Sequence, residues 1–414
     1  MNVRYRVLTV LFLLSTITYL DRVCMNVVSK YVKSDLGLDN QQFGWVLGAF
    51  SLAYALFEIP TGSMGDRLGP RRVLTRVVLW WSGFTMLTGT TTSFLYLLVV
   101  RFLFGMGEAG AYPNASIVIS RWFPAVEVGR AQSVIWAAGR LGGALTPLLV
   151  IPLVHWAGWR WAFAVLGLIG VAWAIGWYVW FRDEPAEKAS VTTSELQTIE
   201  AGRKLRASDH RIPWLAILRN PDLWALMLMC HLFFYGSYFF TNWSATYFQE
   251  GRGMTEDDTK NFISLSYFLG AIGCVIGGLL SDALSKRYGL KLGRRAVGMG
   301  GLGLSSVFFL FAGLATDNQT AGYLLATCVL LKDLALPVAF AVCVDIGQRN
   351  AGAVTGSMNF AGQLGGFFIT ILFGTIVEQT HNFNYPLFLI AGCLLVSALL
   401  WLKIDPTKPV TIQE

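Results

Sequence analysis

The sequence predicts an all-α polytopic membrane protein with twelve transmembrane helices in two pseudo-symmetric six-helix bundles. Three observations support this fold class: apolar segments recur along the whole chain, charged residues are scarce, and the second half repeats the first. Of the 414 residues, 54% are hydrophobic and 14% are charged. Soluble domains carry about 25% charged residues, and about 20 apolar residues are enough to span a bilayer as a helix. The composition therefore excludes a soluble enzyme.

The distribution of basic residues predicts how the chain lies in the membrane. With the N-terminus inside, most of the 32 Lys and Arg residues fall in cytoplasmic segments, as the positive-inside rule requires. The net charge of +7 thus reflects orientation, and no nucleic-acid partner is expected. We expect a multi-pass protein of the inner membrane with both termini in the cytoplasm. The first apolar segment follows Arg4 and Arg6 without a cleavage site behind it, which indicates a retained helix rather than a signal peptide.

A polar segment in the middle of the chain separates the two predicted bundles. We assign residues 1–182 to the N-terminal bundle, 183–213 to a cytoplasmic linker and 214–414 to the C-terminal bundle. The linker is a candidate for an amphipathic helix on the membrane surface.

Short motifs recur between the two halves at a spacing of about 220 residues. Asp66, in a basic turn, is matched by Asp282. The stretch 138–143, AGRLGG, is matched by 361–366, AGQLGG. This pattern indicates a duplicated six-helix unit. The glycine-rich faces would allow close helix approach where the halves meet.

The first helix, expected over about residues 7–28, carries two adjacent charges. Tyr19 and Arg22 belong to a polar stripe at helical spacing, whereas Asp21 points about 160° away from Tyr19. We expect Arg22 to face a central cavity and Asp21 to lie among neighbouring helices. The alternative is that the two charges only compensate each other, since buried charges are normally paired.

The fourth helix carries a cation and a carboxylate in a glycine-rich apolar stretch. At about 100° per residue, Arg101, Gly105, Glu108 and Tyr112 share one face. A charge at the centre of a spanning helix costs about 2.5 to 3.5 kcal/mol, so such residues usually face a bundle interior or an aqueous path. The alternative is a static ion pair that only fixes helix packing. Arg140 in the fifth helix adds a third buried cation to this half.

The second half has fewer ionisable residues within its apolar segments. Lys332 and Asp333 in the tenth helix are the candidates there, and His231 in the seventh is more consistent with a satisfied core residue than with a proton relay. Polar or aromatic side chains that could line a cavity follow in the seventh and eleventh helices: Tyr235, Tyr238, Asn242, Trp243, Asn359 and Gln363.

These residues favour a transporter over an enzyme. The chain has no Walker lysine loop, no GxSxG and no HExxH motif, and its few histidines give no basis for a metal site. A carboxylate in an apolar bundle can titrate near neutral pH. When it is protonated, a neighbouring arginine is released and can bind an anion through two hydrogen bonds. The residues therefore predict a proton-coupled carrier of a small organic anion, driven by the proton gradient and without a cofactor.

The motifs resemble those of the major facilitator superfamily over the whole chain. The turn 65–72, GDRLGPRR, is typical of that superfamily. The stretches 19–22, YLDR, and 101–109, RFLFGMGEA, together with 359–362, NFAG, resemble the anion:cation symporter family. That family includes bacterial galactonate, glucarate and hexuronate transporters, sialin and the vesicular glutamate transporters.

The resemblance implies roles for the matching residues. Asp21 and Glu108 would act in proton coupling, with Arg22 and Arg101 organising the acid site. Tyr19, Tyr54 and Asn359 would line the substrate pocket. To the substrate-binding set we add Arg22, Arg101, Arg140, Trp243 and Gln363. Candidates for conformational gating are Asp66, Arg67, Arg71 and Asp282. We thus expect monomeric symport and uptake of a sugar acid or related carboxylate by alternating access.

Two departures from the family pattern bear on the substrate. Arg140 stands where relatives commonly carry Gln, so either the substrate is more anionic or less hydroxylated than an aldonate, or Arg140 pairs with Glu108. Lys332 and Asp333 have no counterpart that we can match. The alternatives are an aromatic or dicarboxylic acid symporter and a potential-driven anion carrier. A drug:proton antiporter would be expected to carry a Gly-Pro motif in its fifth helix, and a membrane sensor to carry a signalling domain.

Overall fold

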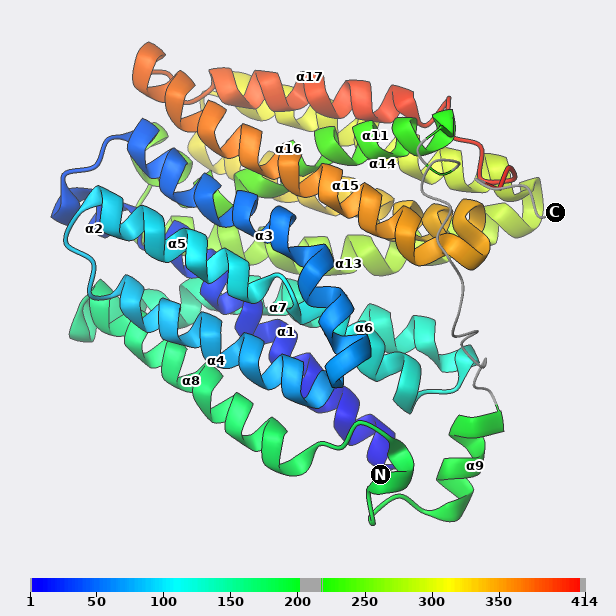
Figure 1. Ribbon diagram of the computed structural model, residues 1–414. Helices are drawn as coiled ribbons and strands as arrows, with labels where there is room; N and C mark the ends of the chain where they lie inside the picture. The colour runs from blue at the N-terminus through cyan, green and yellow to red at the C-terminus, as the bar shows by residue number, and fades with distance from the viewer. Residues whose placement is uncertain (1, 202–216, 218, 410–414) are drawn as a thin grey trace. The chain divides into compact units, whose positions relative to one another are not determined.

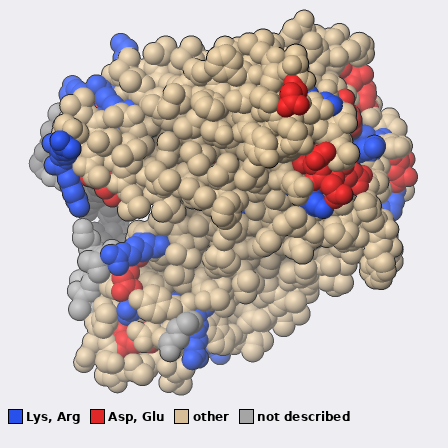
Figure 2. All heavy atoms as spheres, turned by 180° about the vertical axis from the view of Figure 1, so that it is seen from behind, with Lys and Arg blue, Asp and Glu red and all other residues tan. Residues whose placement is uncertain are grey.

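The computed structural model describes residues 2–201, 217 and 219–409, and every regular element in these ranges is a helix (Figure 1). Nine helices of the described chain are long and apolar enough to cross a membrane, and one shorter apolar helix follows near the C-terminus. On the face seen in Figure 2, charged side chains gather toward the left and right edges of the view, and uncharged residues cover most of the surface between them. The predicted all-α multi-pass fold is confirmed.

The chain divides into two compact units. Unit 1 comprises the described residues of 1–32 and 49–210, and unit 2 those of 33–48 and 211–414. The helix α2 (Ser29–Leu36) is divided equally between the two units. The helices that belong wholly or mainly to unit 1 are α1 (Val3–Val27), α3 (Asn40–Leu68), α4 (Pro70–Thr88), α5 (Phe94–Glu108), α6 (Ala111–Trp122), α7 (Ala125–Ala157), α8 (Trp159–Trp180) and α9 (Thr193–Ala201).

Unit 2 contains the remaining long helices. The seventh apolar segment of the chain, which is the first of unit 2, is not a single regular helix. Two π-helical turns, Phe239–Trp243 and Tyr247–Gly251, flank the short α12 (Ser244–Thr246) within it. The long helices of unit 2 are α11 (Pro221–Tyr238), α13 (Glu256–Tyr288), α14 (Leu290–Leu314), α15 (Asn318–Gly347), α16 (Ala351–Thr380) and α17 (Tyr385–Leu400).

The predicted fourth helix is interrupted. α5 ends at Glu108 and α6 begins at Ala111, so Glu108 and Tyr112 belong to two helices rather than to one continuous face. Pro113 explains the break, because it lacks the N–H that would bond to the carbonyl of Ala109 and its ring would crowd that carbonyl. The sequence signal for the break was therefore present in Pro113.

Two short helices, α2 and α9, lie between longer ones. α2 separates α1 from α3. In the linker, α9 carries Glu195, whose carboxylate accepts hydrogen bonds from the backbone N–H groups of Val3 (3.1 Å) and Arg4 (2.9 Å). A carboxylate at this position satisfies otherwise unpaired donors at the start of α1 and complements the helix dipole. The predicted linker residues 202–213 lie outside the described residues.

The same sharp turn joins helices at equivalent places in the two units. Gly69, between α3 and α4, has φ +84°, and Gly289, between α13 and α14, has φ +88°. The positive φ of Gly69 already disfavours any residue with a side chain. A Cβ at this position would also overlap the carboxylate of Asp183. That carboxylate accepts a hydrogen bond from the backbone N–H of Arg71 at 2.8 Å. The turn and its acidic cap form one compact structure.

Gly69→Ala is expected to lower the free energy of unfolding by about 1–3 kcal/mol, because only glycine adopts this backbone conformation without strain. The measurement is the thermal unfolding midpoint of the purified protein in detergent. Gly83→Ala is the matched control: Gly83 lies inside α4 with open space around its Cα, so alanine should raise helix stability slightly. Equal midpoints for the two variants would contradict the argument.

Candidate functional site

The centre of unit 1 holds a buried ion pair between α1 and α5. The guanidinium Nε of Arg22 donates to Oε1 of Glu108, whose side chain is fully buried. The second carboxylate oxygen of Glu108 is also buried and has no hydrogen-bond partner in the described chain. Arg22 is thus the ion-pair partner that the structure gives Glu108, rather than Arg101 or Arg140.

Aromatic rings enclose the guanidinium of Arg22. Its central carbon lies 4.6 Å from the ring centre of Tyr54, 5.3 Å from that of Phe50 and 5.7 Å from that of Tyr19. A guanidinium over an aromatic face is attracted by the ring quadrupole, more strongly where water is excluded. The structure therefore brings three of the predicted residues together, Tyr19, Arg22 and Tyr54, and adds Phe50 to them.

Arg101 also lies against the ring of Phe50. Its guanidinium carbon is 4.5 Å from the ring centre of Phe104 and 5.4 Å from that of Phe50. Arg101 is buried, and its Nε has no hydrogen-bond partner in the described chain. Gly105 allows this arrangement, because a Cβ at that position would overlap the backbone carbonyl of Phe50 in α3. Two arginines therefore share one aromatic ring.

Asp21 is enclosed on the opposite side of α1 from Tyr19. It is 1% exposed, and neither carboxylate oxygen has a hydrogen-bond partner in the described chain under ordinary geometry. The indole of Trp81 and the charges of Arg101 and Glu108 are the groups around it. A buried carboxylate with so few partners is costly in its charged form. Asp21 thus lies among neighbouring helices, as predicted.

A second polar layer connects α1, α6 and α7. The hydroxyl groups of Ser15 and Tyr112 lie 2.7 Å apart, and the ring of Tyr112 stacks on Trp136 with 4.8 Å between ring centres. Ser15 also donates to the carbonyl of Ile135 at 2.7 Å. Arg140 lies one turn after Trp136 on α7 and is buried. The predicted polar stripe of α1 therefore packs against the helix that carries Arg140.

In unit 2 the predicted lining residues form contacts between the seventh segment and α16. The hydroxyl of Tyr238 donates to Oε1 of Gln363, and Asn242 donates to Thr370 Oγ1 at 2.9 Å. Trp243 is fully buried, donates to the carbonyl of Thr370 at 3.1 Å and stacks on Phe373. Asn359 is half-buried on α16. The predicted roles of these residues in substrate binding stay predictions.

Lys332 and Asp333 form a buried ion pair in α15. The ammonium group also donates to Ser237 Oγ at 3.0 Å and lies 4.5 Å from the ring centre of Phe233, both on α11. Sequence reasoning missed Ser237 because the contact joins distant segments. His231, which precedes both of these residues on α11, has its Nδ1 3.0 Å from the carbonyl oxygen of Ala361, as expected for a satisfied histidine.

The predicted gating residues lie at the helix-joining turns. In unit 1 the guanidinium of Arg71 donates to the carbonyl of Tyr178 at 2.6 and 2.9 Å, and Arg67 is exposed in the last turn of α3. The side chain of Asp66 lies outside the described part of the chain. In unit 2, Asp282 pairs with Arg294 at 3.0 Å. Arg294 also pairs with Asp345 at 3.2 Å, a partner that the sequence did not indicate.

Residues 11–370 match the family model of the Major Facilitator Superfamily. The chain belongs to this superfamily. It is 35% identical to a probable sulfoacetate transporter of Cupriavidus necator, over 97% of this chain and 94% of that protein. It is 30% identical to a hexuronate transporter of Bacillus subtilis, over 95% and 92% of the two chains, and 30% identical to a probable L-galactonate transporter of Escherichia coli, over 93% and 85%.

A member of the Major Facilitator Superfamily is a membrane transporter and not an enzyme. The predicted resemblance to bacterial galactonate and hexuronate transporters is confirmed by these relatives. Among solved structures, an inward-facing bacterial homologue of the human lysosomal transporter Spinster matches with a TM-score of 0.77 at 17% identity, over 97% of this chain and 96% of that one. At this identity the match supports the fold alone.

Proposed function

We propose that the chain is a proton-coupled symporter that takes up a small organic anion by alternating access across the inner membrane. The observation that carries the proposal is the buried cluster of Arg22, Glu108, Arg101 and Asp21 in unit 1. Four charged groups of a spanning bundle lie in its interior there, and such groups usually serve transport.

The cluster can couple proton binding to anion binding. Glu108 engages Arg22 when it is charged, and its protonation removes that electrostatic hold. A guanidinium without its carboxylate then favours another anion, which it can bind through two parallel hydrogen bonds. Asp21 and Glu108 are the proposed proton carriers. With Arg101 and Arg140 included, Arg22 is one of three cations inside the spanning bundle that stand against these two acids.

The substrate we propose is a short, poorly hydroxylated acid with two anionic groups. The relative with 35% identity is a probable sulfoacetate transporter, and sulfoacetate carries a sulfonate and a carboxylate but no hydroxyl group. Arg140 supports the same choice, because an arginine offers a charge where a glutamine would offer hydrogen bonds to a sugar hydroxyl. Sugar acids such as hexuronates and galactonate, which other relatives are named for, are the second choice.

Uptake into proteoliposomes tests this function. Vesicles with an imposed inward proton gradient should accumulate labelled sulfoacetate or a short dicarboxylate, and a protonophore should remove the accumulation. Aldonates and uronates in the same assay report the second choice. If no organic anion accumulates in either case, or if accumulation follows the membrane potential and ignores the proton gradient, the proposed symport is wrong.

Arg140→Gln is expected to shift selectivity from dianionic acids toward hydroxylated monoacids by roughly tenfold, about the value of one charge-assisted hydrogen bond pair. The ratio of initial uptake rates for the two substrate classes measures the shift. Arg130→Gln is the matched control, since Arg130 is an exposed arginine of the same helix. An unchanged ratio in a folded Arg140→Gln protein would exclude Arg140 from the pocket.

A further inference from the structure

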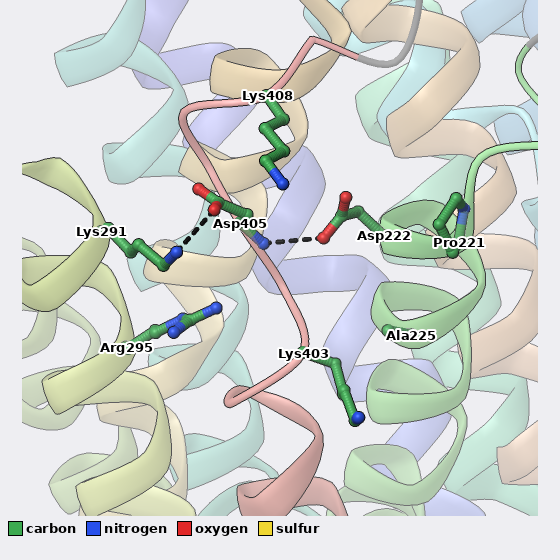
Figure 3. A pocket seen from close by; sticks show the side chains of 8 residues that line it. All are labelled: Pro221, Asp222, Ala225, Lys291, Arg295, Lys403, Asp405 and Lys408. Carbon is green, nitrogen blue, oxygen red and sulfur yellow. Dashed lines mark hydrogen bonds and ion pairs between the residues drawn. The ribbon is translucent and has the colours of Figure 1, made fainter.

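Unit 2 contains a basic cavity of about 420 Å³ at the end where α11 and α14 begin and α17 has ended (Figure 3). Its charged lining residues come from three segments of the chain. Asp222 belongs to the first turn of α11, and Lys291 and Arg295 to α14. The segment after α17 contributes Lys403, Asp405 and Lys408. The lining therefore contains four cations and two carboxylates.

The two carboxylates are already engaged within the protein. Asp405 accepts from Lys291 Nζ at 2.7 Å and from the hydroxyl of Thr407 at 2.6 Å. These hydrogen bonds hold the pKa of Asp405 well below its usual range, so it is charged at neutral pH. Asp222 accepts from the backbone N–H of Asp405 at 2.8 Å. The acids thus build the wall of the cavity and neutralise one of its cations, Lys291.

Three cations remain without a carboxylate partner in the described chain. Arg295 uses its Nε on the carbonyl of Ile404 at 2.9 Å, and its remaining guanidinium nitrogens form no hydrogen bond with a described residue. Lys403 and Lys408 are exposed and form no ion pair in the described chain. In Figure 3 the ammonium group of Lys408 points toward the space between Asp405 and Asp222. The cavity is therefore suited to an anion from outside the protein.

At the equivalent end of unit 1, acidic side chains of that unit bind basic groups and a helix start. Glu195 binds the start of α1, Glu127 pairs with Arg4 at 3.1 Å, and Glu184 lies 3.5 Å from Arg121. Asp183 accepts from the backbone N–H of Arg71 in unit 1, whereas Asp405 accepts from the side chain of Lys291 in unit 2. Arg4 and Arg121 thus have carboxylate partners in unit 1, whereas three cations of the unit 2 cavity have none in the described chain.

Exposed apolar side chains continue from the cavity along the same helix faces. Leu228, two turns after Pro221 on α11, is 49% exposed, and Met299, one turn after Arg295 on α14, is 37% exposed. On α17, which packs against both helices, Leu399 is 53% exposed. An anion with acyl chains could therefore place its charge in the cavity and its chains on these side chains.

We propose that this cavity binds the phosphate of an anionic phospholipid headgroup. Free phosphate shares the same chemistry, but the apolar faces beside the cavity favour the lipid. Each basic side chain near a membrane surface strengthens binding of an anionic lipid by about fivefold. The site does not depend on the proposed transport function, because lipid binding is measured without substrate or gradient.

The test is native mass spectrometry of the full chain titrated with phosphatidylglycerol, or with phosphatidylcholine of the same acyl chains. The wild type should retain phosphatidylglycerol at least about tenfold more tightly than phosphatidylcholine, because only the former carries a net charge. The double variant that carries Lys403→Gln and Lys408→Gln should bind phosphatidylglycerol roughly 30-fold more weakly than the wild type. Both lysines are exposed, so the fold should be retained, and the unfolding midpoint checks this.

Lys286→Gln with Arg287→Gln is the matched control, since these cations lie in the last turn of α13, outside the cavity lining. It should bind phosphatidylglycerol like the wild type. Equal loss in the control, or no loss in the Lys403/Lys408 variant, would overturn the site. Inorganic phosphate is the third arm: if it stabilises the protein alone and displaces phosphatidylglycerol at millimolar concentration, the cavity is a free-anion site and the lipid assignment is wrong.

Discussion

Glu108→Gln is expected to abolish gradient-driven accumulation of the substrate while leaving exchange between preloaded and external substrate. Glutamine keeps the size of the side chain but cannot carry the proton, and it no longer holds Arg22 by charge. Loading and release of an anion can then continue without a driving force. Proteoliposomes assayed in both modes should therefore show uptake that stops at equal inside and outside concentrations.

The control for this experiment is Glu127→Gln, which removes another carboxylate with an arginine partner in unit 1, here Arg4 at 3.1 Å. Its accumulation should match the wild type. If Glu108→Gln still accumulates substrate against its gradient, Glu108 is not a proton carrier. Loss of both accumulation and exchange in a folded variant would point to substrate binding by Glu108 or its partner, which is a different role from the one proposed.

Lys332→Met is expected to lower the free energy of unfolding by about 3–5 kcal/mol, the usual cost of leaving a buried charge without its partner. Asp333 is 0% exposed and would face an apolar side chain in place of the Lys332 ammonium group. The double substitution Lys332→Met with Asp333→Leu removes both charges and should recover most of the loss. Thermal unfolding midpoints in one detergent compare the three proteins.

The double-substitution comparison also separates a structural pair from a functional one. A restored midpoint with normal uptake would mean that Lys332 and Asp333 only support packing. A restored midpoint with lost uptake would give the pair a role in transport, which no matched family residue implies. If Lys332→Met alone is as stable as the wild type, the buried pair contributes nothing to folding and the expected cost is wrong.

Much of the fold could be predicted because apolar length and periodicity depend on local sequence. The spanning segments and the adjacent charges of Asp21 and Arg22 followed from patterns within one helix, and the repeat followed from motifs that recur at a fixed spacing. Contacts between helices could not be predicted in the same way. Phe50 and Phe104 are ordinary apolar residues in the sequence, and only the packing of α3 against α5 makes them a surface for two arginines.

The errors of sequence reasoning have similar physical causes. A helical wheel treated Arg101 to Tyr112 as one continuous face, whereas the missing N–H of Pro113 ends α5 before that face is complete. Ser237 and Asp345 also escaped attention, because a serine or an aspartate acquires a partner only through a distant segment. The partners of charged residues within each unit could therefore be identified only from the structure.

The aromatic rings around Arg22 have a consequence for the energetics of binding. Because Tyr54, Phe50 and Tyr19 surround the guanidinium, loss of the Glu108 ion pair would leave that group close to its present position. An arriving anion would then meet a preorganised cation, and little side-chain entropy would be lost on binding. The main cost that remains is removal of water from the anion itself. This desolvation cost is larger for a doubly charged substrate than for a singly charged one, so binding of a doubly charged substrate should depend most on a second cation.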